Sequence, residues 1–326
     1  MKDKILKELY EHQENHISGE YLRKKLNVSR TAVWKQIQSL KEEGYVIETM
    51  SRKGYRLLEQ RDEILPGGVK FNLNTREIGK EIKYFDTIDS TNTYSKTIAL
   101  EVPHGTIVMS DEQVGGRGRL GRNWSSPKGE GIWMSLILKP GIPPNEGMKV
   151  SHIAAAAVCK GIREITGLEA LVKWPNDIVI NGKKVCGILT EVAGELNEIH
   201  YLIVGIGINV NNIDFPTELE EKASSLLIEG KKKYDRKELI VKIISIFEKF
   251  YDSFIKEGSL EEVLRLCRQY SALIGREVVI IKGGSQEAAK VLGMTDEGFL
   301  EVELSDGRIE HIFSGEVSVR GQGTYV

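Results

Sequence analysis

The stretch IVINGKKVCGILTEV, residues 178–192, contains two apolar runs separated by Asn181-Gly182. Asn-Gly suits the left-handed positions of a two-residue turn, so this stretch predicts a β-hairpin. Before it, SHIAAAAVCKGIREIT (151–166) predicts a packed helix, and after it residues 200–210 predict a buried strand. A helix and strands in this order predict a mixed α/β domain, which we place at residues 64–270.

The first 63 residues predict a separate unit. Apolar residues recur at helical spacing in three segments, around Ile5–Leu9, Tyr21–Leu26 and Val33–Leu40. Ser29 is placed to cap the third helix, and two short extended stretches then enclose a basic turn at residues 50–54. Three helices followed by a basic hairpin predict a winged helix-turn-helix. The break in pattern at Leu65-Pro66-Gly67-Gly68 predicts a linker.

Residues 271–326 predict a unit made of strands. Five short strands are expected, at Glu277–Lys282, Glu287–Met294, Phe299–Leu304, Arg308–Phe313 and Glu316–Arg320. Short strands at this spacing, joined by glycine-containing turns, favour a small β-barrel. The whole chain is therefore expected to be an α+β protein of three domains.

The composition of the 326-residue chain excludes several classes of protein. It is 40% hydrophobic and 28% charged, as in ordinary globular proteins, and a net charge of −2 excludes bulk attraction to nucleic acid. No apolar run is long enough to span a membrane. The charged first 20 residues indicate no secretory signal, and three widely spaced cysteines indicate no disulfide framework, so we expect a cytoplasmic protein.

The segment Gly115-Gly116-Arg117-Gly118-Arg119-Leu120-Gly121-Arg122 carries the strongest chemical signal. Its three guanidinium groups repel one another and its glycines are permissive, so the segment is expected to be flexible until an anion binds. Glycine then lets the backbone close while arginine supplies forked donors, which suits a phosphate. The alternatives are a solvated basic loop or a single RNA-binding element.

A second segment, Lys173-Trp174-Pro175-Asn176-Asp177, leads into the hairpin that carries Lys184. The Asn176 and Asp177 side chains offer oxygens that can orient a ligand or a hydrated Mg²⁺. Taken alone, Trp174 is equally explained as core, Asn176-Asp177 as a turn and Lys184 as a solvated lysine.

Polar residues and glycines also stand near the expected strands. Ser90-Thr91-Asn92 follows a strand expected at Ile82–Phe85, and alone it indicates a helix N-cap. Gln113 can both donate and accept hydrogen bonds just before the glycine-arginine segment. Gly205 and Gly207 permit close approach to a strand, by a ligand or by neighbouring backbone.

Together these motifs resemble the biotin–protein ligases. GRGRLGRNW (116–124), KWPND (173–177) and KVCGIL (184–189) occur in the order typical of that family, and Ser90-Thr91-Asn92 and Gln113 also match. With its N-terminal head the chain resembles the bifunctional bacterial form, which is also the biotin operon repressor. The resemblance covers essentially the whole sequence, and the first two motifs are highly specific as a pair.

The resemblance implies a fold and an activity. The implied fold is a winged helix (1–63), a catalytic domain like that of class II aminoacyl-tRNA synthetases (64–270) and an SH3-like barrel (271–326). The implied enzyme is a ligase that activates biotin with ATP to form biotinyl-AMP. It then transfers biotin to a lysine of the biotin carboxyl carrier protein of acetyl-CoA carboxylase or pyruvate carboxylase.

The resemblance also implies roles for individual residues. Arg119 and Lys184 are the implied catalytic cations. The residues implied to bind biotin or biotinyl-AMP are Ser90, Thr91, Asn92, Gln113, Arg117, Gly118, Arg119 and Lys184. Those implied for ATP and Mg²⁺ are Arg122, Lys173, Asn176, Asp177 and Asn209. No structural metal is expected. Some relatives stack a tryptophan on adenine, but residues 211–230 contain none, so the adenine stack stays unplaced.

The N-terminal unit carries only a small excess of positive charge, so binding to DNA would depend on where its cations lie. Residues 1–60 hold 12 Lys/Arg against 9 Asp/Glu, an excess of only three. Arg30, Thr31 and Lys35 lie off the apolar stripe of the third helix and can face a major groove, while Arg52 and Lys53 can reach phosphate. Trp34, beside them, is either exposed or partly core. A protein-interaction head is the alternative.

A single head makes few phosphate contacts, so a repressor needs a dimer on a two-fold operator. The resemblance implies that biotinyl-AMP, as co-repressor, promotes this homodimer. Two other functions stay open. One is an acyl-adenylate enzyme for lipoate or octanoate, against which the two motifs favour biotin. The other is a transcription factor whose central domain only binds its ligand, against which Arg119 and Lys184 favour an enzyme.

Overall fold

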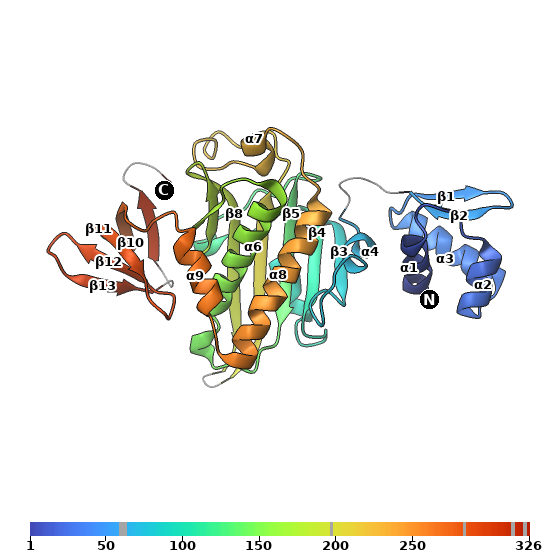
Figure 1. Cartoon of the computed structure of the whole chain (residues 1–326), viewed down its shortest axis with the longest axis horizontal. Coiled ribbons are helices and arrows are strands. Elements are labelled where there is room, and N and C mark those ends of the chain that lie inside the picture. The colour runs from blue at the N-terminus through green and yellow to red at the C-terminus, as the bar shows by residue number, and fades with distance from the viewer. Residues whose placement is uncertain (59–63, 196–197, 283–284, 314–316, 322–324) are drawn as a thin grey trace. The chain divides into compact units, whose positions relative to one another are not determined.

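The computed structural model describes residues 1–58, 64–195, 198–282, 285–313, 317–321 and 325–326. The chain divides into two compact units, Met1–Asn74 and Thr75–Val326 (Figure 1). Among the helices of these ranges, none combines the length and the apolar character needed to cross a bilayer.

The first unit is a bundle of three helices with a short hairpin. Its elements are α1 Lys2–Glu11, α2 Gly19–Leu26, α3 Arg30–Glu42, β1 Ile47–Met50, β2 Gly54–Leu57 and α4 Pro66–Lys70. The Ser29 hydroxyl accepts a hydrogen bond from the Ala32 N–H at 3.1 Å, which confirms the predicted cap of α3. Val33, Ile37 and Leu40 are buried in one core with residues of α1 and β2. The predicted helices and hairpin are confirmed.

The linker expected at Leu65–Gly68 is wrong. Pro66–Lys70 forms the short helix α4, which proline begins. The Gly67 N–H donates to the Tyr45 hydroxyl at 2.8 Å, and a Cβ on Gly67 would lie 2.6 Å from a Leu6 methyl carbon. Proline and glycine here mark a helix packed closely on the first unit rather than a flexible connection.

A seven-stranded sheet forms the middle of the second unit, with the strand order β3-β4-β5-β9-β8-β7-β6. The strands are β3 Ile82–Ile88, β4 Thr106–Gln113, β5 Gly131–Leu138, β6 Leu171–Lys173, β7 Asp177–Ile180, β8 Lys183–Gly194 and β9 Ile199–Asn209. β3 and β4 pair in parallel and the other pairs are antiparallel. The predicted hairpin is confirmed as β7–β8, with Asn181 at φ 49° and Gly182 at φ 78°.

Three helices cover one face of this sheet (Figure 1). They are α6 Lys149–Thr166, α8 Arg236–Glu257 and α9 Glu261–Gln269. The shorter elements are α5 Thr91–Ile98, α7 Leu226–Gly230 and two 3₁₀ turns, Arg119–Gly121 and Pro144–Glu146. α6 confirms the helix expected at 151–166. It packs closely on α8, because a Cβ on Gly161 would lie only 2.6 Å from the Ile243 side chain.

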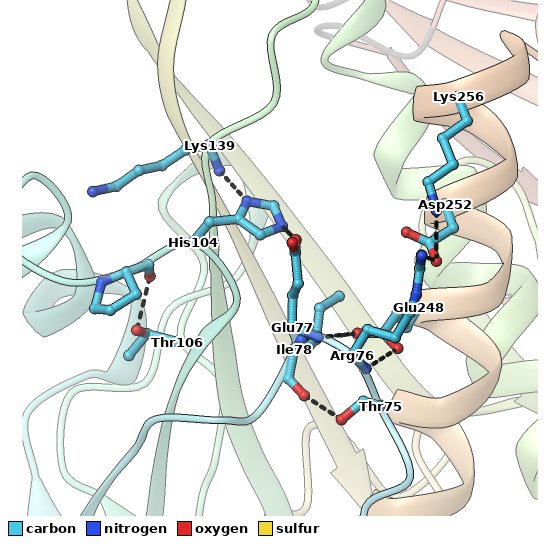
Figure 2. Close-up of polar contacts among 11 residues, drawn as sticks. Thr75, Arg76, Glu77, Ile78, His104, Thr106, Lys139, Glu248, Asp252 and Lys256 are labelled. Carbon is cyan, nitrogen blue, oxygen red and sulfur yellow. Dashed lines mark hydrogen bonds and ion pairs between the residues drawn. The ribbon is translucent and has the colours of Figure 1, made fainter.

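One carboxylate fixes the start of the second unit to α8 (Figure 2). Glu248, 7% exposed, accepts hydrogen bonds from the backbone N–H groups of Arg76, Glu77 and Ile78 at 2.7, 2.9 and 2.9 Å. Burial opposes its charge, but the three donors hold the pKa of Glu248 below its ordinary value. Arg76 also pairs with Asp252, one turn further along α8.

Five antiparallel strands form the last part of the second unit, in the order β13-β12-β11-β10-β14. They are β10 Glu277–Lys282, β11 Ser285–Met294, β12 Leu300–Leu304, β13 Ile309–Ile312 and β14 Val317–Gly321. The predicted strands are confirmed, while Glu316, the expected start of the fifth, lies outside the described residues. The Trp174 Nε1–H donates to the Gly298 carbonyl at 3.0 Å and so ties this sheet to the central one.

Candidate functional site

A cavity of about 380 Å³ lies against β8 and β9. Every residue expected to bind biotin, ATP or Mg²⁺ lines it: Ser90, Thr91, Asn92, Gln113, Arg117, Gly118, Arg119, Arg122, Lys173, Asn176, Asp177, Lys184 and Asn209. These residues come from segments far apart in the sequence. The fold thus brings the glycine-arginine segment and Lys184 together at one small cavity.

A buried polar network forms one part of the cavity wall. The Gln113 side-chain oxygen accepts a hydrogen bond from the Thr91 N–H at 2.8 Å, and its amide donates to the Ser126 hydroxyl at 2.8 Å. The Ser135 hydroxyl contacts Thr91 Oγ1 at 2.8 Å and Asn92 Oδ1 at 2.6 Å. These neutral groups are preorganised to offer both donors and acceptors to an uncharged polar ligand.

Ser90 and its neighbours have two roles in this wall. The Ser90 hydroxyl accepts from the Thr93 N–H at 3.4 Å, so the simple N-cap interpretation holds. Asn92 also donates to Glu191 at 2.8 Å, and a Cβ on Gly205 would lie 2.1 Å from Asn92 Oδ1. Gly205 is thus required by a neighbouring side chain in this structure.

The glycine-arginine segment forms a tight loop beside the cavity. The Gly118 N–H donates to the Arg122 carbonyl at 2.7 Å, and Leu120, at φ 56°, is 59% exposed at its tip. The Arg119 guanidinium donates to Asn176 Oδ1 at 2.9 Å. Partial burial lowers the pKa of Arg119, because a charge there is poorly solvated. A bound anion would offset that cost.

Asp177 and Lys184 face each other across the β7–β8 hairpin. Lys184 Nζ lies 2.6 Å from Asp177 Oδ1, and the Lys184 side chain is 23% exposed. Burial opposes the Asp177 charge, but the ammonium groups of Lys184 and Lys173 hold its pKa below the ordinary value. Lys184 is therefore a cation of the cavity and not a solvated surface lysine. Trp174, by contrast, is 2% exposed, as its core interpretation requires.

The cavity is also lined by three aromatic residues for which no role was predicted: Trp124, Phe215 and Tyr325. The Trp124 ring centre lies 5.0 Å from Lys184 Nζ. A Cβ on Gly207 would lie 2.6 Å from Trp124 Nε1, so this glycine makes room for the indole. The tryptophan that ends GRGRLGRNW was a usable signal. Phe215 and Tyr325 stand in no motif.

The residues expected to bind DNA belong to the first unit. Arg30, Thr31 and Lys35 are exposed on α3, and Arg52 and Lys53 are exposed in the turn between β1 and β2. Arg52 takes the left-handed conformation, with φ 65°. Beside them Trp34 is 53% exposed, so its core interpretation is wrong.

Three family models match successive parts of the chain. The biotin/lipoate A/B protein ligase family matches residues 84–209, which include most of the cavity. An HTH domain matches residues 2–56, and the biotin protein ligase C-terminal domain matches residues 273–320. Fold and site together define a protein ligase of the biotin and lipoate type.

Individual relatives narrow this class. The bifunctional ligase/repressor BirA of Bacillus subtilis is 40% identical over 320 residues, covering 97% of this chain and 98% of the relative. The Escherichia coli protein of that name is 29% identical, covering 93% and 92%. A solved biotin protein ligase from Aquifex aeolicus, in complex with biotin and ATP, has a TM-score of 0.66 and 31% identity, covering 74% of this chain and 100% of that one. The chain belongs to the family of bifunctional biotin–protein ligases and repressors.

Proposed function

We propose that this protein activates biotin with ATP to biotinyl-5′-AMP, transfers biotin to a lysine of a biotin carboxyl carrier protein, and represses transcription with biotinyl-AMP as co-repressor. One observation carries the catalytic part. Arg119 and Lys184 line the same cavity as the buried network of Thr91 and Gln113. A neutral pocket beside two cations suits a ligand with a polar ring at one end and a reacting carboxylate at the other.

The polar wall holds the ring end of biotin. The ureido group of biotin has one carbonyl and two N–H groups, so it needs donors and acceptors at fixed positions. Ser90, Thr91 and Gln113 supply both kinds without charge. The long acyl chain then places the carboxylate toward Arg119 and Lys184.

The two cations assist formation of the adenylate. A biotin carboxylate oxygen attacks the α-phosphorus of ATP, the bond to the β-phosphate oxygen breaks, and pyrophosphate leaves. Lys184 and Arg119 offset repulsion between carboxylate and triphosphate and stabilise charge that builds on the phosphoryl oxygens. Asn176 Oδ1 accepts from Arg119, and the two Asp177 oxygens are engaged by Lys184 and Tyr325, so these side chains do not fit as direct Mg²⁺ ligands. Mg²⁺ bound by the triphosphate would supply further neutralisation of its charge.

The glycine-arginine loop protects the product. A mixed anhydride hydrolyses in open water, so a loop that closes over it excludes solvent. The exposed tip at Leu120 is placed to move inward around the fixed donor Arg119. A carrier lysine then attacks the acyl carbon, an amide forms and AMP leaves. No nucleophile from this chain is required.

Aromatic groups in the same cavity offer a place for adenine. Trp124 and Phe215 both line it, and the Trp124 ring lies beside Lys184. Purines stack well on such faces. We assign the adenine to this part of the cavity, in place of the tryptophan that residues 211–230 lack.

The first unit supplies the repressor function. Its exposed α3 residues suit a major groove and its wing cations suit phosphate. A pair of heads on a two-fold operator doubles the phosphate contacts, so a homodimer favoured by biotinyl-AMP would couple ligand to DNA affinity. Equal operator affinity with and without biotinyl-AMP would exclude this switch.

We extend the proposal to finer features of the fold. The antiparallel last sheet, with a bulge between Val291 and Gly293, suits an SH3-like barrel. The mainly antiparallel central sheet with helices on one face suits the class II aminoacyl-tRNA synthetase type. The three family matches fall within the functional domains that we propose at 1–63, 64–270 and 271–326, although residues 64–74 pack with the first compact unit. Three buried free cysteines suit a cytoplasmic protein.

Carrier mass tests the catalytic proposal. The purified protein is incubated with biotin, Mg²⁺-ATP and a carrier domain, and the carrier is expected to gain one biotinyl group. A carrier with its acceptor lysine replaced by arginine is the control. A carrier of unchanged mass would contradict the proposal and favour a protein that only binds its ligand. Stronger ATP–pyrophosphate exchange with lipoate or octanoate than with biotin would favour the related acyl-adenylate enzyme.

A further inference from the structure

Tyr325 brings a phenol from beyond the last strand to the charged end of the cavity. Its hydroxyl donates a hydrogen bond to Asp177 Oδ2, and Tyr325 lines the cavity itself. The other Asp177 oxygen, Oδ1, pairs with Lys184 Nζ at 2.6 Å. The phenol and the ammonium therefore divide the two oxygens of one carboxylate.

The ring of Tyr325 has a second charged neighbour. Lys173 Nζ lies 3.5 Å from the ring centre, and Lys173 is only 4% exposed. Lys173 and Asp177 are register partners in β6 and β7, so this ammonium is near the same carboxylate. Tyr325 thus gives the Lys173 cation an aromatic face while its hydroxyl occupies Asp177.

Other contacts hold the last sheet on the central one. Trp174 donates to the Gly298 carbonyl at 3.0 Å, and Arg268 donates to the Met294 carbonyl at 2.9 Å. The two carbonyl acceptors belong to the β11–β12 hairpin, and neither bond involves Tyr325. The tyrosine contact is therefore not needed to dock the sheet, and its partners point to the reaction.

We propose that Tyr325 is a positioning residue for adenylate formation: its hydroxyl orients Asp177 so that Lys184 is held toward the reacting phosphate, and its ring keeps Lys173 from displacing Lys184. The proposal rests on the proposed function, because it assigns Lys184 to the phosphate. Loss of the hydroxyl frees one Asp177 oxygen, and two lysines then compete for the carboxylate. Loss of the ring removes the restraint on Lys173 as well.

The first test needs no turnover. The ¹³Cγ resonance of Asp177 is measured at neutral pH in protein labelled at aspartate, in wild type and Tyr325→Phe. The variant is expected to shift the resonance, because the carboxylate loses one of its hydrogen-bond donors. An unchanged resonance would overturn the proposal.

The second test measures pyrophosphate release with biotin and Mg²⁺-ATP. Tyr325→Phe is expected to lower kcat about tenfold, with the KM for biotin unchanged. Tyr325→Ala should lose more, since the ring is absent too. Tyr270→Phe is the matched control, because Tyr270 also carries a cation over its ring, Arg163 at 4.2 Å, but does not line the cavity.

The outcomes separate the two proposals. A wild-type protein that releases no pyrophosphate with biotin contradicts the proposed function, while the Asp177 resonance still decides whether Tyr325 orients the carboxylate. A Tyr325→Phe variant with wild-type kcat overturns the positioning role. Equal losses in Tyr325→Phe and Tyr270→Phe would also overturn it.

Discussion

Glu248 and Asp177 are both nearly closed to water, but they are held in opposite ways. Glu248 accepts three backbone N–H groups, whose positions the fold fixes. Asp177 is held by the ends of side chains, the Lys184 ammonium and the Tyr325 phenol. Backbone donors cannot turn to a ligand without local unfolding, whereas a lysine can. The comparison separates a carboxylate held for stability from one that we propose serves the reaction.

The largest expected effect lies on the Asp177 side. Lys184→Gln should lower the rate of biotinyl-AMP formation about 10³-fold, because it removes the cation to which we assign stabilisation of the developing phosphoryl charge. Pyrophosphate release checks this. Lys183→Gln is the matched control, since Lys183 lies next in the same hairpin but donates to the Glu220 carbonyl. Comparable losses in both variants would break the distinction drawn above.

His152 adds a buried group that no charge stabilises. Complete burial lowers its pKa to about 4 from 6.5. Between those values the unfolded chain binds the proton more tightly, so the free energy of unfolding should fall by about 3 kcal/mol as pH drops from 6.5 to 4. Denaturant titrations of wild type and His152→Gln check this. The variant should lose that part of the pH dependence, and the exposed His200→Gln should keep it.

The Glu248 side of the comparison predicts a smaller effect, on stability alone. Glu248→Gln should lower the free energy of unfolding by about 2 kcal/mol, because charge-assisted bonds to three amides are lost. Biotin KM should not change. Because the folded pKa is depressed, this contribution is present above about pH 4.5 and is lost as pH falls through the folded pKa. Glu257→Gln, an exposed position on α8, is the control. A large loss of activity in Glu248→Gln would place it with Asp177.

The smallest effect is expected for the solvent-exposed lysine of the β1–β2 turn and concerns operator binding. Lys53→Ala in the β1–β2 turn should weaken operator binding only a few-fold and reduce the slope of log affinity against log salt by about one. Lys4→Ala, exposed on α1, should change neither. Binding at several salt concentrations checks both variants, and equal slopes for Lys53→Ala and wild type would remove the wing from the DNA interface.

Local chemistry could be predicted from the sequence. The Ser29 cap and the Asn181-Gly182 turn depend on groups within a few residues, and both were found as expected. The prediction of a linker at Leu65–Gly68 is wrong because the Gly67 N–H donates a hydrogen bond to the Tyr45 hydroxyl, 22 residues away in the sequence. Tertiary contact there overrides the usual meaning of proline and glycine.

In the candidate site, too, the residues within motifs could be predicted from the sequence, whereas the long-range contacts could not. Motifs brought Arg119, Lys184 and Asp177 into one hypothesis, and they line one cavity. Tyr325 lies 148 residues from Asp177 and stands in no motif, so its contact could not be predicted. Glu248 likewise looks like any other glutamate of an amphipathic helix until the fold brings residues 76–78 to it.

Retention of biotinyl-AMP tests most directly whether the glycine-arginine loop and Lys184 enclose an acyl phosphate. The release of labelled biotinyl-AMP after rapid dilution is compared between wild type and Arg119→Ala. We expect the variant to release it at least tenfold faster, since a charged hydrogen bond to phosphate is lost. An unchanged half-life and affinity in Arg119→Ala would contradict the loop's role as a lid over this cavity.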